Sequence, residues 1–259
     1  MKKNIRVQVA NPAGNITIFV HDEVPRSKYA SVGKQLLEKS GLGAEQVAFI
    51  TGPRSIEMSG MEFCGNATRS FALLRAMEEV AGACSITVTT SGVSEPLVVD
   101  VDPENDWARV HMQLPKRILE TEDGSKLVDM EGIMHLIKTD IPPSIVAFEE
   151  LRDAICSKYD PEAMGVMFLQ EMPYGQHITP YVYVRDVNSV YEEGSCATGS
   201  VAVAIYLSLG KPDGEYEYEL RQPDGTLIAR TTVADGTLKE VSIEGKVLFD
   251  SIVMAEVDM

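Results

Sequence analysis

The sequence predicts an α/β protein made of two similar halves, and three observations support this fold class. Segments in which apolar and polar residues alternate recur along the 259 residues, as is typical of strands. Four longer segments place apolar residues three and four apart, as is typical of helices. The third observation is an internal repeat, because Cys64 and Cys196 each stand directly before a mostly apolar helical segment. Two halves that each carry a cysteine at a helix start are the simplest explanation.

The first half is taken as residues 1–115. Alternation predicts strands at residues 5–9, 16–20, 47–51, 86–90, 97–101 and 108–114. Helical spacing predicts helices at 25–39 and 67–80, and Gly41 provides the stop signal of the first one. The segment before Cys64 is rich in Gly, Ser and Met and is predicted to be a loop.

The second half, residues 116–259, repeats this organisation after a joint at Pro115-Lys116-Arg117. Strands are predicted at 132–137, 165–169, 181–185, 226–233, 240–243 and 246–249. Helices are predicted at 148–159 and 196–209, and the residues QPDG from Gln222 form a turn. The last strand of the chain is expected to be able to return to the first half.

The net charge of −16 argues against two classes of partner. Such a surface repels phosphate backbones and anionic lipid, so neither nucleic acid nor a membrane is expected. No apolar stretch approaches the roughly 20 residues that span a bilayer. The basic start is not followed by an apolar signal core, so we expect a cytoplasmic protein.

The four cysteines predict neither a zinc site nor a disulfide framework. None lies in a C-x-x-C pair, and cytosolic thiols stay reduced. Cys84 lies just before a strand and Cys156 on a helix, where each fits a small buried residue. Cys64 and Cys196 differ because of their place at helix starts. No metal is expected.

A cysteine at a helix start is suited to proton transfer. Unpaired backbone N–H groups and a partial positive charge there stabilise a thiolate, so the thiol pKa is expected to fall towards neutrality. The same N–H groups bind a carboxylate. If two such helix starts hold one amino acid, a sulfur faces each side of its α-carbon. Such a pair can racemise an amino acid, with one thiolate as base and one thiol as acid, without pyridoxal phosphate or another cofactor.

Two other classes of function remain open. One cysteine paired with a histidine could form a covalent acyl intermediate, but this leaves the repeated motif unexplained. A non-catalytic amino-acid-binding protein would keep the site and leave the configuration of its ligand unchanged.

The motifs around both cysteines resemble those of the diaminopimelate epimerase family. The family pattern A-x-x-C-G-N-G-x-R-C is similar to EFCGNATRS, which begins at Glu62. The pattern G-E-x-x-A-C-G-T-G-A is similar to EEGSCATGS, which begins at Glu192. Two weaker similarities are G-x-G-N-D-F with PAGNIT from Pro12, and G-N-P-H with GIMH from Gly132. Their order and spacing hold along nearly the whole chain.

This resemblance implies two pseudo-symmetric halves, each a curved, mostly antiparallel sheet around a central helix, with the active site between them. It implies that Cys64 and Cys196 are the two bases and that His135 helps to tune one of them. The substrate-binding residues that it implies are Asn15 and the carboxylate-binding N–H groups of Gly65, Asn66, Ala197, Thr198 and Gly199.

The sequence departs from the family where a distal carboxylate and ammonium of diaminopimelate would be held. Family asparagines are replaced by Ser55, Ile133 and Ala163, and a Glu-Arg pair is replaced by Val187-Asn188. Because buried charge partners are hard to replace, diaminopimelate is not the expected substrate.

The variant motifs look more like those of the histidine racemases of opine metallophore biosynthesis. Histidine is therefore the expected substrate, with Glu192, Glu57 and Ser55 as further candidates to contact it. Diaminopimelate epimerase, a racemase of another amino acid and an isomerase of the phenazine-biosynthesis type remain alternatives. The expected partner is a small amino acid, and a homodimer is left open.

Overall fold

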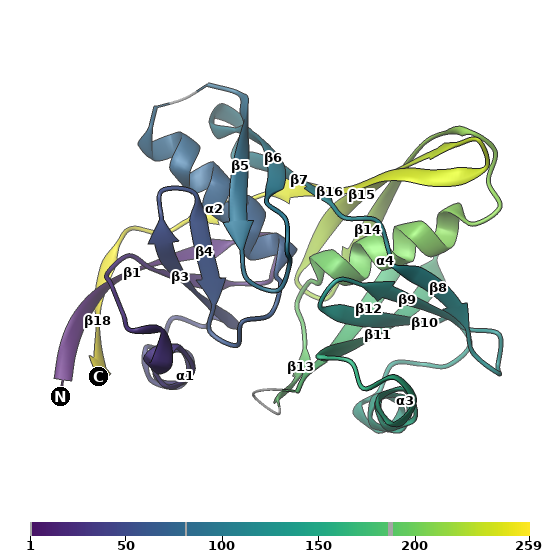
Figure 1. Cartoon of the computed structure of the whole chain (residues 1–259), viewed down its shortest axis with the longest axis horizontal. Helices are drawn as coiled ribbons and strands as arrows, with labels where there is room; N and C mark the ends of the chain where they lie inside the picture. The colour runs from purple at the N-terminus through teal and green to yellow at the C-terminus, as the bar shows by residue number, and fades with distance from the viewer. Residues whose placement is uncertain (1, 81, 186–188) are drawn as a thin grey trace. The chain divides into compact units, whose positions relative to one another are not determined.

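Strand pairing and packing divide the chain into two units, seen in a computed structural model that describes residues 2–80, 82–185 and 189–259 (Figure 1). Unit 1 comprises Met1–Val110 and Gly245–Met259, and unit 2 comprises His111–Glu244. The chain leaves unit 1 inside strand β7 (Trp107–Met112) and returns to it inside strand β16 (Thr237–Lys246). None of the helices in the described part of the chain has the length and hydropathy needed to cross a membrane.

Unit 1 is a mixed sheet in which the first and last strands of the chain lie side by side at one edge. In spatial order, its strands are β18 (Val253–Asp258), β1 (Lys2–Asn11), β2 (Thr17–Val20), β3 (Gln46–Gly52), β4 (Ser55–Met58), β5 (Cys84–Thr90), β6 (Leu97–Asp102) and β7. The short strand β17 (Leu248–Phe249) pairs with the end of β1. Helices α1 (Tyr29–Lys39) and α2 (Gly65–Glu78) connect the two parallel pairs, β2–β3 and β4–β5.

Unit 2 has its own mixed sheet. In spatial order, its strands are β8 (Arg117–Glu120), β9 (Lys126–Met130), β10 (Ile133–Lys138), β11 (Ala163–Met172), β12 (Gly175–Val184), β14 (Gly214–Gln222), β15 (Gly225–Ala234) and β16. A short strand, β13 (Ser189–Glu192), pairs with β12. Helices α3 (Ile145–Tyr159) and α4 (Ala197–Ser208) connect the parallel pairs β10–β11 and β12–β14.

The two sheets have the same sequence of strand orientations. In each, two antiparallel pairs are followed by a parallel, an antiparallel and a parallel pair, and then by two further antiparallel pairs. Helix α1 thus corresponds to α3, and α2 corresponds to α4. The repeated cysteine motif predicted two similar halves, and the family resemblance implied that they are pseudo-symmetric and mostly antiparallel; this fold class is confirmed.

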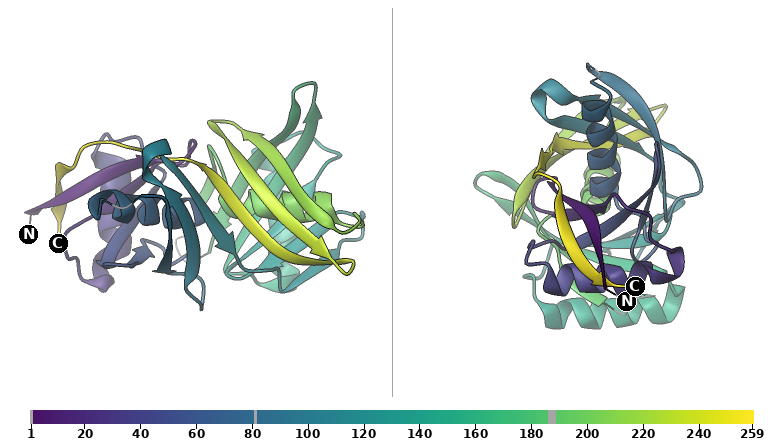
Figure 2. Two further views of the ribbon diagram at one scale, coloured as in Figure 1. Left: turned by 90° about the horizontal axis from the view of Figure 1, so that it is seen from above. Right: turned by 90° about the vertical axis from the view of Figure 1, so that its left-hand side faces the viewer.

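The central helices are buried from their first residue. Every residue from Gly65 to Leu74 in α2 and from Ala197 to Ile205 in α4 is buried. A helix that is buried on all faces has no solvent-facing polar stripe, and in α2 the buried residues include the charged Arg69. Helix α4 contacts strands towards both edges of the unit 2 sheet, including β9 and β10 on one side and β14 and β15 on the other. The sheet therefore curves around this helix. Figure 2 shows the long strands of unit 2 passing across this helix.

The outer helices pack through aromatic pairs. Tyr29 of α1 stacks on Phe49 of β3, with ring centroids 3.9 Å apart. In unit 2, Phe148 of α3 stacks on Tyr181 of β12 at 5.6 Å. Each helix thereby covers one face of its sheet.

Several strands were not predicted from the sequence. Strand β4 lies in the segment predicted to be a loop, and β8, β9, β13 and β18 were also missed. Strand β14 was missed because its alternation is of Glu with Tyr, and only Leu220 and Gln222 are buried near its end. Helix α3 begins at Ile145 rather than at 148, because Ser144 caps it by accepting a hydrogen bond from the Ala147 N–H (3.2 Å).

Candidate active site

Both predicted catalytic cysteines are the N-cap residues of the central helices. Cys64 has φ −128° and ψ 109°, and Cys196 has φ −119° and ψ 112°. Each sulfur accepts a backbone N–H bond from the third helical residue, Ala67 at 3.3 Å and Gly199 at 3.4 Å. Sulfur thus takes the place of the side-chain oxygen that usually caps a helix. Both thiols are buried, with 7% and 5% exposure.

A hydroxyl holds the backbone of each cysteine. Thr68 Oγ1 donates to the Cys64 carbonyl (2.8 Å), and Ser200 Oγ donates to the Cys196 carbonyl (2.6 Å). In each case the hydroxyl lies four residues after the cysteine, where a side chain reaches the preceding turn. The two motifs therefore have matching local structures.

The side-chain amide of Asn15 is hydrogen-bonded to the first thiol and to a second side-chain amide, that of Asn66. Asn15 Oδ1 accepts hydrogen bonds from Cys64 Sγ (3.7 Å) and from Asn66 Nδ2 (3.5 Å). Asn15 Nδ2 donates to Glu45 Oε2 at 2.9 Å. The turn before Asn15 contains Ala13 in the left-handed region (φ 64°), a conformation that L residues rarely adopt outside functional or tightly constrained sites. The predicted residue Asn15 is thus in contact with Cys64.

The second thiol belongs to a different network. Thr198 Oγ1 lies 3.5 Å from Cys196 Sγ and 2.9 Å from His135 Nε2. His135 is fully buried, and burial lowers its pKa to about 3, so its ring is neutral near pH 7. Its Nδ1 finds no partner among the described residues. Because an unpaired buried N–H costs more than an unpaired lone pair, we place the proton on Nε2, from which it is donated to Thr198.

The pKa of the Cys196 thiol is raised well above its usual value, which corrects the expectation from its place at a helix start. Burial is the first cause, and the charge of Glu193, which shares a hydrogen bond with the thiol, is the second. The Gly199 N–H and the Thr198 hydroxyl lower the pKa, but they are outweighed. Helix capping is therefore not enough to make this buried sulfur a thiolate.

Glu193 is the acidic residue that contacts the second thiol, and its neighbour Glu192 has other contacts. Glu193 is 7% exposed, and its N–H donates to the Pro180 carbonyl (3.0 Å). Glu192 is exposed and accepts a hydrogen bond from the Tyr181 hydroxyl (2.6 Å). The sequence does not distinguish the two, because they are adjacent acidic residues at the end of a short apolar segment.

The other predicted contact residues lie in β4. Glu57 forms an ion pair with Arg26 (3.2 Å), and Ser55 accepts a hydrogen bond from Thr51 (2.8 Å). At the positions where the family carries asparagines, Ile133 and Ala163 are buried apolar residues of β10 and β11. Val187 and Asn188 lie outside the described residues.

Sequence reasoning missed several residues that support the site. Gln222 is one of them, because its Oε1 accepts the Cys196 N–H bond (2.7 Å) and its Nε2 donates to Ser200 (3.0 Å). The sequence predicts only a turn at Gln222. Arg69 and Glu45 were also missed, the first although it stands in the motif around Cys64. Contacts of this kind join residues far apart in the chain and have no periodic signal.

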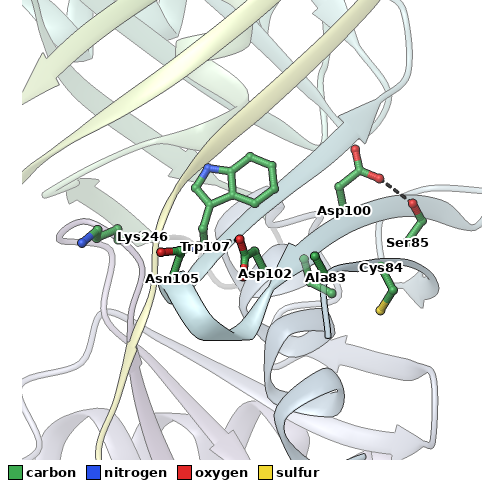
Figure 3. A pocket seen from close by; sticks show the side chains of 9 residues that line it. Ala83, Cys84, Ser85, Asp100, Asp102, Asn105, Trp107 and Lys246 are labelled. Atoms are coloured by element: carbon green, nitrogen blue, oxygen red, sulfur yellow. Dashed lines mark hydrogen bonds between the residues drawn. The ribbon is translucent and has the colours of Figure 1, made fainter. Parts of the chain in front are cut away.

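A hollow of 610 Å³ lies in unit 1, and none of the predicted site residues lines it (Figure 3). Its lining includes Trp107 and Lys246 together with Asp100, which accepts a hydrogen bond from Ser85 (2.6 Å).

Comparison with known proteins identifies the family to which the chain belongs. The family model described as the histidine racemase CntK N-terminal domain matches residues 4–254. A histidine racemase of Fusobacterium nucleatum is 33% identical over 261 residues, covering 92% of this chain and 94% of the relative.

More distant proteins extend the comparison. A diaminopimelate epimerase of Buchnera aphidicola is 26% identical over 164 residues, which are 56% of each chain. The solved structure of a predicted epimerase from Pseudomonas aeruginosa has a TM-score of 0.66 at 13% identity, covering 98% of this chain and 99% of the other. The chain therefore belongs to the histidine racemase family of isomerases, as its motifs predict.

Proposed function

We propose that this protein interconverts L- and D-histidine, with Cys64 and Cys196 as the two bases. The observation that carries the proposal is the match between the two thiols, which cap their helices with the same backbone conformation and the same type of N–H bond. Membership in the histidine racemase family supports the choice of substrate. Each unit contributes one thiol, so we propose that both units are needed for activity.

The proton balance of the proposed reaction is simple. One sulfur, as thiolate, takes the α-proton, so that a C–H bond breaks and an S–H bond forms. The other sulfur, as thiol, gives its proton to the opposite face of the α-carbon. The carbanion between these steps places negative charge on the carboxylate, which fixed N–H donors stabilise. After one turnover the two sulfurs have exchanged their protonation states.

The backbone N–H groups of the helix starts are the proposed carboxylate-binding groups. In unit 1 these belong to Gly65 and Asn66, and in unit 2 to Ala197 and Thr198. The Gly199 N–H already donates to Cys196 Sγ, so its contribution would be to the sulfur. Such donors act on the transition state more strongly than on the ground state because charge grows on the oxygens they face.

The Thr198 hydroxyl has a separate role in the proposal. With its oxygen accepting from His135, its own proton is directed at Cys196 Sγ and stabilises the thiolate when that sulfur is the base. Asn15 would fix the first thiol and contact the substrate. Glu57, Ser55 and the exposed Glu192 remain candidates for contacts to the amine or the imidazole.

Histidine is preferred over diaminopimelate because the groups that would hold a second amino-acid centre are absent from two positions. Ile133 and Ala163 are apolar and buried, and neither can bind a distal carboxylate or ammonium. A racemase of another amino acid and a non-catalytic amino-acid-binding protein are the alternatives that the experiment must separate.

The test is racemisation in heavy water with reduced protein. We expect both enantiomers of histidine to lose optical rotation and to gain deuterium at the α-carbon. Cys64→Ala and Cys196→Ala should each abolish the reaction, whereas Cys84→Ala and Cys156→Ala are matched controls that should leave it intact. Activity on another amino acid, including diaminopimelate, would replace histidine as the substrate. Binding without deuterium uptake would refute a racemase.

Two further properties belong to the proposal. We expect the enzyme to work in the cytoplasm, where both thiols stay reduced. The protein could also form a homodimer, and the molar mass of the purified protein measured by light scattering tests this: twice the mass of one chain would support the homodimer and the mass of one chain would refute it.

A further inference from the structure

Arg69 is the largest fully buried side chain of the described protein, with 0% exposure. It lies in α2, five residues after Cys64. Charged side chains are almost never fully buried unless they are paired, because the loss of hydration must be offset by fixed partners. The partners of Arg69 therefore indicate what this buried charge is used for.

The guanidinium group of Arg69 connects three separate segments. Its Nη2 donates to the Pro12 carbonyl (3.0 Å), at the start of the turn that carries Asn15. Its Nη1 donates to the carbonyls of Gly245 (2.8 Å) and Lys246 (3.3 Å), where the chain re-enters unit 1. Its Nε donates to Asn66 Oδ1 at 3.1 Å. The planar fork of arginine can serve all of these directions at once, and the single ammonium of lysine cannot.

The bond to Asn66 determines the orientation of two carboxamides. Since Arg69 can only donate, the Asn66 atom that faces it must be the oxygen, and the amide nitrogen must face the other way. That nitrogen donates to Asn15 Oδ1, which is also the atom that accepts from Cys64 Sγ. Arg69 thus fixes the side-chain oxygen beside the first thiol through Asn66, and the backbone before Asn15 through Pro12.

The second unit shows that the helix packing itself does not require an arginine. The residue five positions after Cys196 is Val201, which is also fully buried in α4. The two helices have corresponding positions in their sheets, yet one carries a charge and the other an isopropyl group. The presence of an arginine at position 69 is therefore explained by its hydrogen bonds to Asn66 and to the carbonyls of Pro12, Gly245 and Lys246.

We propose that Arg69 is the positioning residue of the first thiol, setting Asn66 and Asn15 in the orientation that Cys64 needs to exchange a proton. This inference rests on the proposed two-thiol function for its effect on turnover. Its claim about the surroundings of Cys64 can be tested without turnover.

The test is a double-mutant cycle between Arg69→Lys and Asn15→Ala. Arg69→Lys keeps the charge and loses the fork, so we expect kcat/KM to fall about 10- to 100-fold, as for loss of one hydrogen bond to a charged group. If Arg69 acts through Asn15, adding Arg69→Lys to Asn15→Ala should cost less than about threefold. Arg75→Lys is the matched control on the same helix, since Arg75 pairs with Glu78 near the surface, and it should leave kcat/KM unchanged.

Two results would overturn the proposal. One is full additivity of the two losses, which a merely structural role would give. The other is a kcat/KM for Arg69→Lys within about twofold of wild type. If Arg69→Lys loses its native circular dichroism, Asn66→Ala takes its place in the cycle, because it removes the connecting side chain and leaves the carbonyl contacts of Arg69 in place.

The same cycle can be followed by alkylation, which separates this proposal from the proposed function. The rate of Cys64 carbamidomethylation is measured by mass spectrometry, with Cys196 of the same molecule as internal reference. We expect Arg69→Lys to change the ratio of the two rates at least about threefold, and to change it little when Asn15 is already alanine. An unchanged ratio refutes the positioning role even if histidine is racemised. A changed, non-additive ratio supports it even if histidine is not the substrate.

Discussion

The substitution Gly165→Ala tests the buried contact between two neighbouring strands of unit 2. Gly165 of β11 is the parallel register partner of His135 in β10. A Cβ atom at position 165 would lie 2.4 Å from His135 Nδ1 and 2.8 Å from its Cε1. Ordinary contacts to a Cβ begin at 3.4 Å, so the ring must move by about 1 Å.

This movement breaks the hydrogen bond that orders the second thiol. His135 Nε2 lies 2.9 Å from Thr198 Oγ1, and a shift of about 1 Å moves the pair beyond hydrogen-bond distance. Overpacking contributes about 1–3 kcal/mol to the loss of stability, and the unpaired buried groups contribute about 1–3 kcal/mol more. For a chain of this size we expect the melting temperature to fall by roughly 5–20 °C.

The assay combines thermal unfolding, followed by circular dichroism, with racemisation of histidine. Gly214→Ala is the matched control in the same unit, because the nearest atom to its added Cβ is 3.5 Å away. The decisive comparison is Gly165→Ala in a His135→Ala background, where the clashing ring is gone. There only the flexible end of Met167, whose Cε lies 3.0 Å from the added Cβ, has to shift, so the substitution should be close to neutral. If it destabilises both backgrounds equally, the clash with the ring is not the cause and the reasoning is refuted.

Other predictions concern the groups around the second thiol. Glu193→Gln removes the charge that raises the pKa of Cys196, so alkylation of Cys196 at pH 7.5 should become several-fold faster, while Glu192→Gln should leave the rate unchanged. Because burial lowers the pKa of His135 to about 3 from an ordinary 6.5, the unfolded chain binds one more proton between these values. The free energy of unfolding should therefore fall by up to about 1.4 kcal/mol per pH unit as pH decreases through this window, and denaturant titrations of His135→Gln should lack this contribution. Gln222→Leu leaves the buried Cys196 N–H without its acceptor, and the same titrations should give a loss of about 1–3 kcal/mol, whereas no loss would contradict the importance of that bond.

The sequence predicted the place of both thiols because it depends on local signals, and it predicted the fold class through the repeated motif together with the family resemblance. A cysteine followed by small residues and an apolar run marks a buried helix start, and this holds for Cys64 and Cys196 alike. It did not identify Glu193 as the acid beside Cys196, since the inward direction of a residue after a short strand is set by tertiary packing. The raised pKa of Cys196 could not be predicted from the sequence either, because desolvation depends on all the groups that surround the sulfur.

Strand β18 makes unit 1 depend on a segment that follows unit 2 in the chain, and unit 2 has no such dependence. Residues 111–244 form unit 2 without interruption, so a ribosome has delivered all of it before the last strands of unit 1 exist. Unit 1 gains its edge strand only when Val253–Asp258 pairs with β1, with Lys2 opposite Asp258. The two ends of the chain therefore lie next to each other (Figure 1). A circular permutant that joins these ends and opens the chain at residue 111 would encode unit 2 first and unit 1 as one continuous segment.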